Sequence, residues 1–255
     1  MKYTKFNLFK QEPLMLKSDP VNNKIIFANW KMNFSKDDVV DFCQKLKQNL
    51  SAKNNLVIAP PAAYISIVQT ILPDIQIASQ DVSKVNSEQG AFTGEISAYI
   101  LKSLGVKYAI VGHYERRKIF NERTEEILTK AKNCLQKGIT PILCFGEEEI
   151  GTSPVRYLQE LNNYFTEKDS IIYAYEPYWA IGNENFQFKI VEQNMHQMLD
   201  YLNQDNKNPT KSLIYGGSVN SKNIIQLNTI KNLDGLLVGS ASLKLDELLK
   251  ILENI

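Results

Sequence analysis

The chain has 255 residues, of which 44% are hydrophobic, so it can bury a core large enough for one large α/β domain or two small ones. Its 29 basic and 28 acidic residues give a formal net charge of +1. With this balance, no broad electrostatic field favours a nucleic acid or an anionic membrane surface as partner. No apolar run reaches the roughly 18 residues of a membrane helix, and three widely spaced cysteines form no disulfide pattern, so we expect a soluble, cytoplasmic protein with free thiols.

Residues 1–22 differ in character from the rest of the chain. They lack an uninterrupted apolar stretch followed by a cleavage site, unlike a secretion signal, and they end in the turn-rich sequence SDPVNN. We expect an N-terminal extension of unknown role: a disordered arm, a short packed element, or a product of translation from Met1 rather than Met15. No linker divides the remainder, so residues 23–255 are assigned to a single domain.

From Ile25 onward, short apolar runs alternate with longer amphipathic stretches, which is typical of a parallel sheet with crossover helices. Most runs are apolar without alternation, as expected for strands covered on both faces. Eight strands, each followed by a helix or turn, predict a single closed (β/α)8 barrel. An open doubly wound sheet is the alternative, but no GxGxxG follows the first run. The predicted strands are residues 25–28, 56–59, 75–78, 108–111, 141–145, 171–175, 212–215 and 236–238.

Several of the intervening segments carry helix signals. Ser35 is followed three residues later by Asp38, a capping-box arrangement. Asn121 is the candidate N-cap of the next such segment, which has acidic residues early, lysines late and Gly138 as its stop signal. His196 lies in another predicted helix, where we expect it to face solvent.

Polar residues follow most of the predicted strands directly, where a barrel of this kind carries its active site. Taken alone, each of them is more often a solvated charge, a structural histidine or a simple turn. Their joint placement favours a functional site. These segments are residues 29–31 after the first strand, 112–117 after the fourth, 146–147 after the fifth, Glu176 after the sixth, 216–218 after the seventh and 239–240 after the eighth.

The residue types at these strand ends indicate a reaction class. Glu176 is surrounded by aromatic residues, which partly dehydrate a carboxylate and make it a stronger base. The glycine and serine turns after the last two strands can present backbone N–H groups to a phosphate ester. Together with His113 and Lys31, and without a cluster at metal-ligand spacing, this set suits proton abstraction beside a carbonyl.

Seven stretches resemble the triosephosphate isomerase family, in the family's order, and they cover the chain from about residue 25 to its end. The resemblance implies a TIM barrel that interconverts dihydroxyacetone phosphate and D-glyceraldehyde 3-phosphate by proton transfer through an enediolate, in glycolysis and gluconeogenesis. It implies no cofactor and no metal. The stretches are FANWKMN, GAFTGEIS, VGHYERR, CFGE, AYEPYWAIG, YGGSVN and DGLLVGSAS.

The resemblance also implies roles for individual residues. Glu176 would be the base, neutral His113 would polarise the carbonyl, and Lys31 would supply positive potential. Asn29 would add a further catalytic hydrogen bond, and Glu115 would be a supporting catalytic carboxylate near Lys31. The substrate would be bound by Asn29, Lys31, Gly182, Ser218, Gly239 and Ser240.

A lid and a partner subunit are implied in the same way. Residues 177 to about 186 would close over the substrate, with Tyr215 receiving the closed lid and Glu147 lying near Trp179. The family is typically a homodimer in which Thr93 reaches the partner's site, and we expect a homodimer here, with no nucleic acid and no membrane as partner.

Four positions depart from the family pattern. Tyr114 replaces a usual Ser and Tyr178 a usual aliphatic residue, and we hypothesise that the two compensate for each other. Glu184 stands in the lid tip where a cation is usual, so we expect altered lid kinetics or weaker substrate binding. Ser240 adds a Cβ where glycine is common.

Two rival interpretations remain at this stage. One is a catalytically weakened barrel that acts as a binding protein, and the other is an isomerase of larger phosphosugars. The presence of Lys31, His113 and Glu176 argues against the first. A lid suited to a three-carbon phosphate argues against the second.

Overall fold

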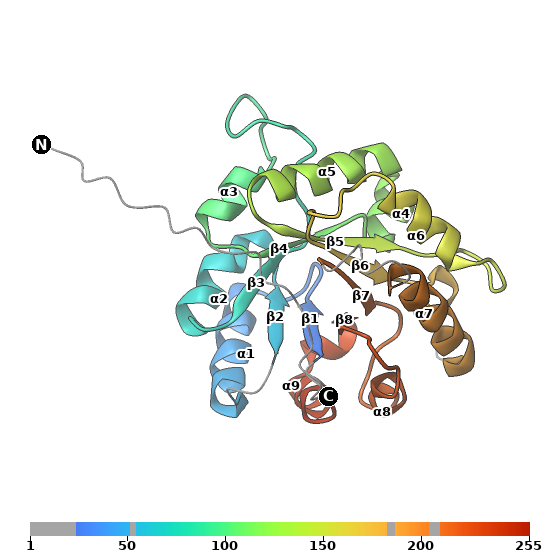
Figure 1. The fold of residues 1–255 in the computed structure, drawn as a ribbon. Coiled ribbons are helices and arrows are strands. Elements are labelled where there is room, and N and C mark those ends of the chain that lie inside the picture. The colour runs from blue at the N-terminus through green and yellow to red at the C-terminus, as the bar shows by residue number, and fades with distance from the viewer. Residues whose placement is uncertain (1–23, 52–54, 183–186, 204–209) are drawn as a thin grey trace, which may run out of the picture.

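The computed structural model describes residues 24–51, 55–182, 187–203 and 210–255. Within these residues, eight parallel strands close into a barrel in chain order, and the helices lie around its outside (Figure 1). The predicted barrel is confirmed, and the open doubly wound sheet is wrong. The predicted extension, residues 1–22, lies outside the described residues, so its separation from the barrel stays a prediction. The strands are β1 (Ile25–Asn29), β2 (Leu56–Ala59), β3 (Gln76–Ser79), β4 (Tyr108–Val111), β5 (Thr140–Phe145), β6 (Ile171–Tyr175), β7 (Lys211–Tyr215) and β8 (Gly235–Val238).

The strands are mostly apolar because both of their faces are covered. Successive residues of β1 illustrate this: Phe27 belongs to a core cluster inside the barrel, whereas Ile26 and Ala28 pack in the cluster that includes the outer helices. All three are fully buried. Continuous apolar runs therefore marked the strand boundaries, which agree with the predicted ones to within one residue.

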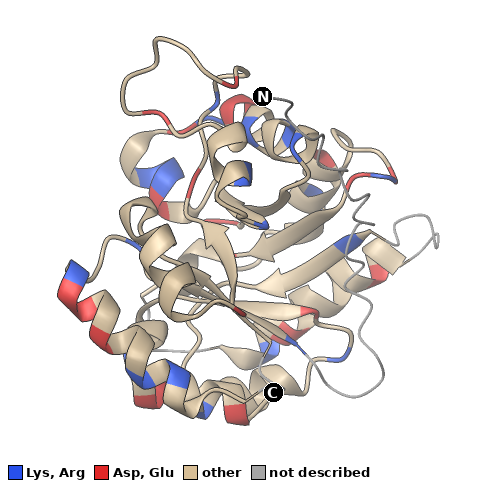
Figure 2. Cartoon of the chain, turned by 90° about the vertical axis from the view of Figure 1, so that its left-hand side faces the viewer, with Lys and Arg blue, Asp and Glu red and all other residues tan. Residues whose placement is uncertain are grey.

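Helices connect the strands and cover the outside of the barrel. Charges of both signs are interspersed over these helices (Figure 2), as the near-zero net charge leads one to expect. Among the described residues, none of the helices has both the length and the apolar character that crossing a membrane requires. The α-helices are α1 (Lys36–Asn49), α2 (Ile65–Ile71), α3 (Ala98–Ser103), α4 (Tyr114–Phe120), α5 (Thr124–Gln136), α6 (Pro154–Asn162), α7 (Phe188–Asn203), α8 (Ile224–Asn228) and α9 (Leu245–Glu253), and the 3-10 helices are η1 (Ala62–Tyr64), η2 (Tyr178–Ala180) and η3 (Ser240–Leu243).

The predicted helix ends are correct with one exception. The capping box of Ser35 and Asp38 is present, and Gly138 follows α5 with a φ of 64°. The assignment of Asn121 as the N-cap of α5 is wrong, because it ends α4 in the left-handed conformation with a φ of 52°. Asparagine tolerates this conformation, so the same residue can end one helix just before another begins. The start of α5 is instead set by Glu126, whose carboxylate accepts the N–H of Arg123 at 3.0 Å.

At the opposite end of the barrel from the strand carboxyl ends, we expect a half-buried carboxylate to make stability depend on pH. Asp234 precedes β8, and one of its oxygens accepts the N–H of Leu213 at 2.8 Å. Burial raises the pKa of Asp234 from 3.8 to about 6, although the Leu213 bond and the charge of Lys24 oppose this shift. Between pH values of about 4 and about 6, Asp234 therefore keeps its proton in the folded protein and loses it in the unfolded chain.

We expect this carboxylate to cost stability as pH rises from about 4 to about 6, because deprotonation then favours the unfolded chain. Asp234→Asn keeps an oxygen for the Leu213 N–H and cannot ionise. The variant should therefore gain about 1–2 kcal/mol relative to wild type across this window, after allowance for solvent screening. Urea unfolding of both proteins at pH 4, 5, 6 and 7 measures the difference, and a difference that does not change with pH would contradict the prediction.

Candidate active site

The site residues expected from the sequence come together at the carboxyl ends of the strands. There they line a cavity of about 120 Å³. Glu115 lies beside this cavity through its ion pair with Lys31, while Thr93 is in the exposed segment between β3 and α3. The expected residues that line the cavity are Asn29, Lys31, His113, Glu176, Gly182, Ser218, Gly239 and Ser240.

Glu176 follows β6 directly and is only 1% exposed. Its backbone N–H donates to the carbonyl of Phe145 at 2.7 Å, and its Oε2 accepts the N–H of Tyr114 at 3.1 Å. Its Oε1 lies 3.3 Å from His113 Nε2 and, among the described residues, has no hydrogen-bond donor directed at it. One carboxylate oxygen is thus held in place, while the other can accept a proton.

Gly216 leaves the space that this carboxylate occupies. A Cβ added at Gly216 would lie 2.9 Å from Glu176 Cγ. Any side chain there would therefore displace the carboxylate. The first glycine after β7 thus helps to place Glu176, in addition to forming a turn.

His113 is the N-cap of α4 and is 7% exposed. Its Nδ1 accepts the backbone N–H of Glu115 at 3.3 Å. A ring nitrogen that accepts a hydrogen bond carries no proton, so this contact assigns the proton of a neutral ring to Nε2. Nε2–H is then a hydrogen-bond donor at the cavity wall, and it makes no hydrogen bond to Glu176 Oε1.

Lys31 has a left-handed backbone with a φ of 52°, which is unfavourable for a non-glycine residue. Its N–H donates to the side chain of Asn29 at 3.0 Å, and its carbonyl accepts from Gln80 at 2.8 Å. Its ammonium pairs with Glu115 Oε1 at 2.7 Å. These contacts hold the strained residue so that its cation lies at the cavity.

The turns after β7 and β8 complete the cavity wall. The carbonyl of Ser218 accepts from Asn223 Nδ2 at 2.7 Å. The carbonyl of Gly239 accepts both the N–H and the hydroxyl of Ser242, at 2.9 and 2.7 Å. Since these carbonyls are bonded away from the cavity, the turns are fixed in an orientation that suits an anion.

The segment after Glu176 is anchored by a buried carboxylate, Glu147, which is 1% exposed. Its Oε1 accepts the Tyr175 hydroxyl at 2.7 Å and Trp179 Nε1 at 2.8 Å, and its carbonyl accepts the N–H of Tyr178 at 2.9 Å. The expected proximity of Glu147 and Trp179 is confirmed. The expected lid tip, residues 183–185, lies outside the described residues, so the prediction for Glu184 stays a prediction.

Tyr215 is the last residue of β7 and is fully buried. Its hydroxyl has no hydrogen-bond partner among the described residues, and a Cβ at Gly217 would lie 2.2 Å from it. Burial raises the pKa of Tyr215, so the hydroxyl stays protonated and can donate. Such a group suits the expected role of receiving the closed lid.

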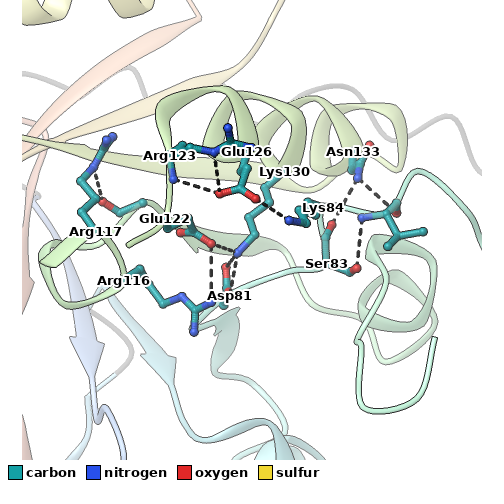
Figure 3. Close-up of polar contacts among 12 residues, drawn as sticks. Asp81, Ser83, Lys84, Arg116, Arg117, Glu122, Arg123, Glu126, Lys130 and Asn133 are labelled. Carbon is teal, nitrogen blue, oxygen red and sulfur yellow. Dashed lines mark hydrogen bonds and ion pairs between the residues drawn. The ribbon is translucent and has the colours of Figure 1, made fainter. Parts of the chain in front are cut away.

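The sequence reasoning missed an ion cluster formed by Asp81, Arg116, Glu122 and Lys130, which lies beside a second cavity of about 430 Å³ (Figure 3). Lys130 is 4% exposed and pairs with Asp81 at 2.8 Å and also with Glu122. Arg116 of α4 lies 3.3 Å from Asp81. The cluster ties the start of the segment that carries Thr93 to α4 and α5. Because Asp81 is distant in the sequence from the other three residues, no local pattern predicted the cluster.

The second cavity is the larger one, yet it contains none of the expected site residues. The smaller cavity is the candidate active site, because a buried carboxylate, an imidazole and a cation meet there. The described residues contain no group of three or more His, Cys, Asp or Glu that could hold a metal ion.

Comparisons with known proteins agree with this arrangement. The family model described as triosephosphate isomerase matches residues 24–255. The protein named triosephosphate isomerase in Orientia tsutsugamushi (strain Ikeda) is 36% identical over 245 residues, covering 91% of this chain and 97% of its own. The protein of that name in Mesomycoplasma hyopneumoniae (strain 7448) is 38% identical, with 91% and 99% covered. The one in Ehrlichia chaffeensis (strain ATCC CRL-10679 / Arkansas) is 35% identical, with 89% and 95% covered.

Proposed function

The chain belongs to the triosephosphate isomerase family and is an isomerase of triose phosphates, and from this premise we propose which of its residues perform the reaction. The family assignment favours an enzyme over a barrel that only binds a partner, and over an isomerase of larger phosphosugars. The position of Glu176 is the main observation that supports these residue roles. Its carboxylate is buried, has one unengaged oxygen and lies 3.3 Å from His113 Nε2.

Glu176 acts as the base in the proposed mechanism. Its Oε1 removes a proton from the substrate carbon next to the carbonyl, and the electron pair of that C–H bond forms the C=C bond of an enediolate. His113 donates its Nε2 proton as a hydrogen bond to the carbonyl oxygen, where negative charge develops. The proton of the neighbouring hydroxyl moves to this oxygen by way of His113 Nε2, and the electron pair left on the hydroxyl oxygen forms the new C=O bond as Glu176 returns its proton to the former carbonyl carbon. Lys31 stabilises the negative charge of the substrate, with Asn29 donating a further hydrogen bond.

The phosphate is proposed to bind at the turns after β7 and β8. Backbone N–H groups of Gly182, Ser218, Gly239 and Ser240 are proposed to donate to its oxygens. The two turns after β7 and β8 line the same cavity as Glu176, which supports this placement. Closure of the segment that follows Glu176 would then exclude water from the reacting atoms.

The activity assay is the experiment that tests the proposed roles. Wild-type protein should convert glyceraldehyde 3-phosphate to dihydroxyacetone phosphate in an assay coupled to reduction of the product. His113→Gln keeps a donor at this position and should lower kcat by about 100-fold or more. A variant with unchanged kcat would remove His113 from the mechanism.

We also propose a homodimer in which the segment between β3 and α3 inserts into the partner near Asn29. This segment protrudes from the barrel (Figure 1). Large apolar side chains are exposed on it and around it: Met32 is 96% exposed, Phe92 46% and Phe120 62%. Exposed apolar groups of this size typically mark a protein interface. Met32 is next to Lys31, and Phe92 is next to Thr93, so such an interface would adjoin the site.

Phe92→Asp is expected to weaken the dimer by at least about 2 kcal/mol, because a charge would be buried at the interface. Sedimentation velocity at low micromolar concentration should show monomers, with lower activity. Ile225→Asp is the matched control, because Ile225 is 64% exposed on α8 and should leave the dimer intact. A Phe92→Asp variant that stays dimeric and fully active would exclude this segment from the interface.

The proposed location is a reducing compartment, the cytoplasm. Cys43, Cys134 and Cys144 are buried and unpaired, and burial raises the pKa of each thiol. Raised thiol pKa values make these cysteines unreactive, which suits a role as core residues.

A further inference from the structure

Two tyrosines are in contact beside the proposed base, and neither has a role in the mechanism given above. Tyr114 is the first residue of α4, and Tyr178 is the first residue of η2. Their ring centroids are 4.8 Å apart at an interplanar angle of 51°. Both side chains are half-buried. The pair therefore joins the helix that starts after β4 to the segment that starts after β6.

Each tyrosine is linked directly to Glu176. The N–H of Tyr114 donates to Glu176 Oε2 at 3.1 Å, so the position of Tyr114 sets the position of one carboxylate oxygen. Tyr178 is separated from Glu176 only by Pro177, whose ring restricts its φ, here −60°. The backbone between the base and Tyr178 therefore has little freedom.

Tyr178 is also held by contacts with Glu147, which follows β5. Its N–H donates to the carbonyl of Glu147 at 2.9 Å, and the neighbouring Trp179 donates to the Glu147 carboxylate at 2.8 Å. With the ring contact to Tyr114 and the bond from the Tyr114 N–H to Glu176, these contacts link α4 to the residues that follow β5 and β6.

We propose that the contact between the Tyr114 and Tyr178 rings is a positioning device that holds the Glu176 carboxylate in the place required for proton transfer. The inference rests on the proposed role of Glu176 as base. Tyr114 and Tyr178 are positioning residues, because they act on the reaction through Glu176. The ring contact, and not the hydroxyl groups, carries the effect.

A double-mutant cycle tests the proposal. Tyr114→Ser and Tyr178→Val each remove one ring, and each should lower kcat about fivefold to tenfold with KM changed by less than about twofold. The double variant should lose little more than either single variant, which gives a coupling of several-fold. Tyr114→Phe and Tyr178→Phe keep the rings and should remain within about twofold of wild type.

A second readout separates positioning from a purely structural role. Substrate that carries deuterium on the carbon that loses its proton should show a larger primary isotope effect on kcat in the ring-removing variants, because a misplaced base makes proton abstraction more rate-limiting. Tyr164→Ser is the control, because Tyr164 is 54% exposed and outside the cavity. This variant should leave both kcat and the isotope effect unchanged.

Several outcomes would overturn the proposal. Provided that the wild type is active, strictly additive losses in the cycle would overturn it. So would Phe variants that are as impaired as the variants that lack a ring. An unchanged isotope effect, with only the Tm lowered, would also overturn it. A folded wild type without isomerase activity would instead contradict the proposed function, and this inference would fall with it.

Discussion

Shortening Glu176 to Asp should lower kcat at least about 100-fold while the protein stays folded. The substitution removes one methylene and retracts the carboxylate by about 1.5 Å. A misplacement of about 1 Å at a reacting group can cost about 100-fold in rate. The carboxylate cannot follow, since β6 is fixed on both sides by β5 and β7. KM should change much less, because the phosphate contacts come from other turns.

The matched control for this prediction is Glu148→Asp. Glu148 comes directly after Glu147, and its side chain is 73% exposed. The same chemical change at Glu148 should leave kcat within about twofold of wild type. If Glu176→Asp retained more than about a tenth of the wild-type kcat, Glu176 would not be the base, and the mechanism would need another carboxylate.

Gly146→Ala should have the largest effect on stability. A Cβ at this position would lie 1.9 Å from the carbonyl oxygen of Glu176 and 2.6 Å from its carbonyl carbon. These are backbone atoms at the end of β6, and the adjacent N–H of Glu176 is bonded to Phe145 at 2.7 Å. Neither strand can move without breaking this bond, so we expect a loss of more than about 3 kcal/mol, or failure to fold.

Gly151→Ala separates this clash from ordinary backbone strain. Gly151 has a φ of 96°, but a Cβ there would meet no atom within 4 Å. Its replacement should cost only about 1–2 kcal/mol. Urea unfolding at a fixed protein concentration measures both variants, because stability of a dimer depends on concentration. Equal losses at Gly146 and Gly151 would contradict the clash argument.

The fold and the site were predictable from the sequence to different extents. The strands could be placed because both faces are buried, so each strand is one apolar run. Asn29, His113 and Glu176 could be assigned to one site from the sequence alone, because barrel topology brings the carboxyl ends of all strands together. These predictions needed only local patterns and one rule about topology.

Features that depend on side-chain contacts between distant segments were harder to predict. Asn121 satisfies the composition rules for both ends of a helix, and only its left-handed backbone decides between them. The ion pairs of Lys130 with Asp81 and Glu122 join segments without any sequence signal. For Tyr114 and Tyr178, the hypothesis of compensation gave no geometry, whereas the structure places the two rings in contact.

The most direct test of the central claim, that Glu176 transfers a proton between two substrate carbons, is isomerisation by the wild-type protein in D2O followed by NMR. A carboxyl group that has taken up a proton can exchange it with solvent, so the account predicts product that carries deuterium on the carbon that receives the proton, and at least about 100-fold slower product formation by Glu176→Asp. Absence of isomerisation by the folded wild-type protein, or an equally fast Glu176→Asp variant, would contradict the claim.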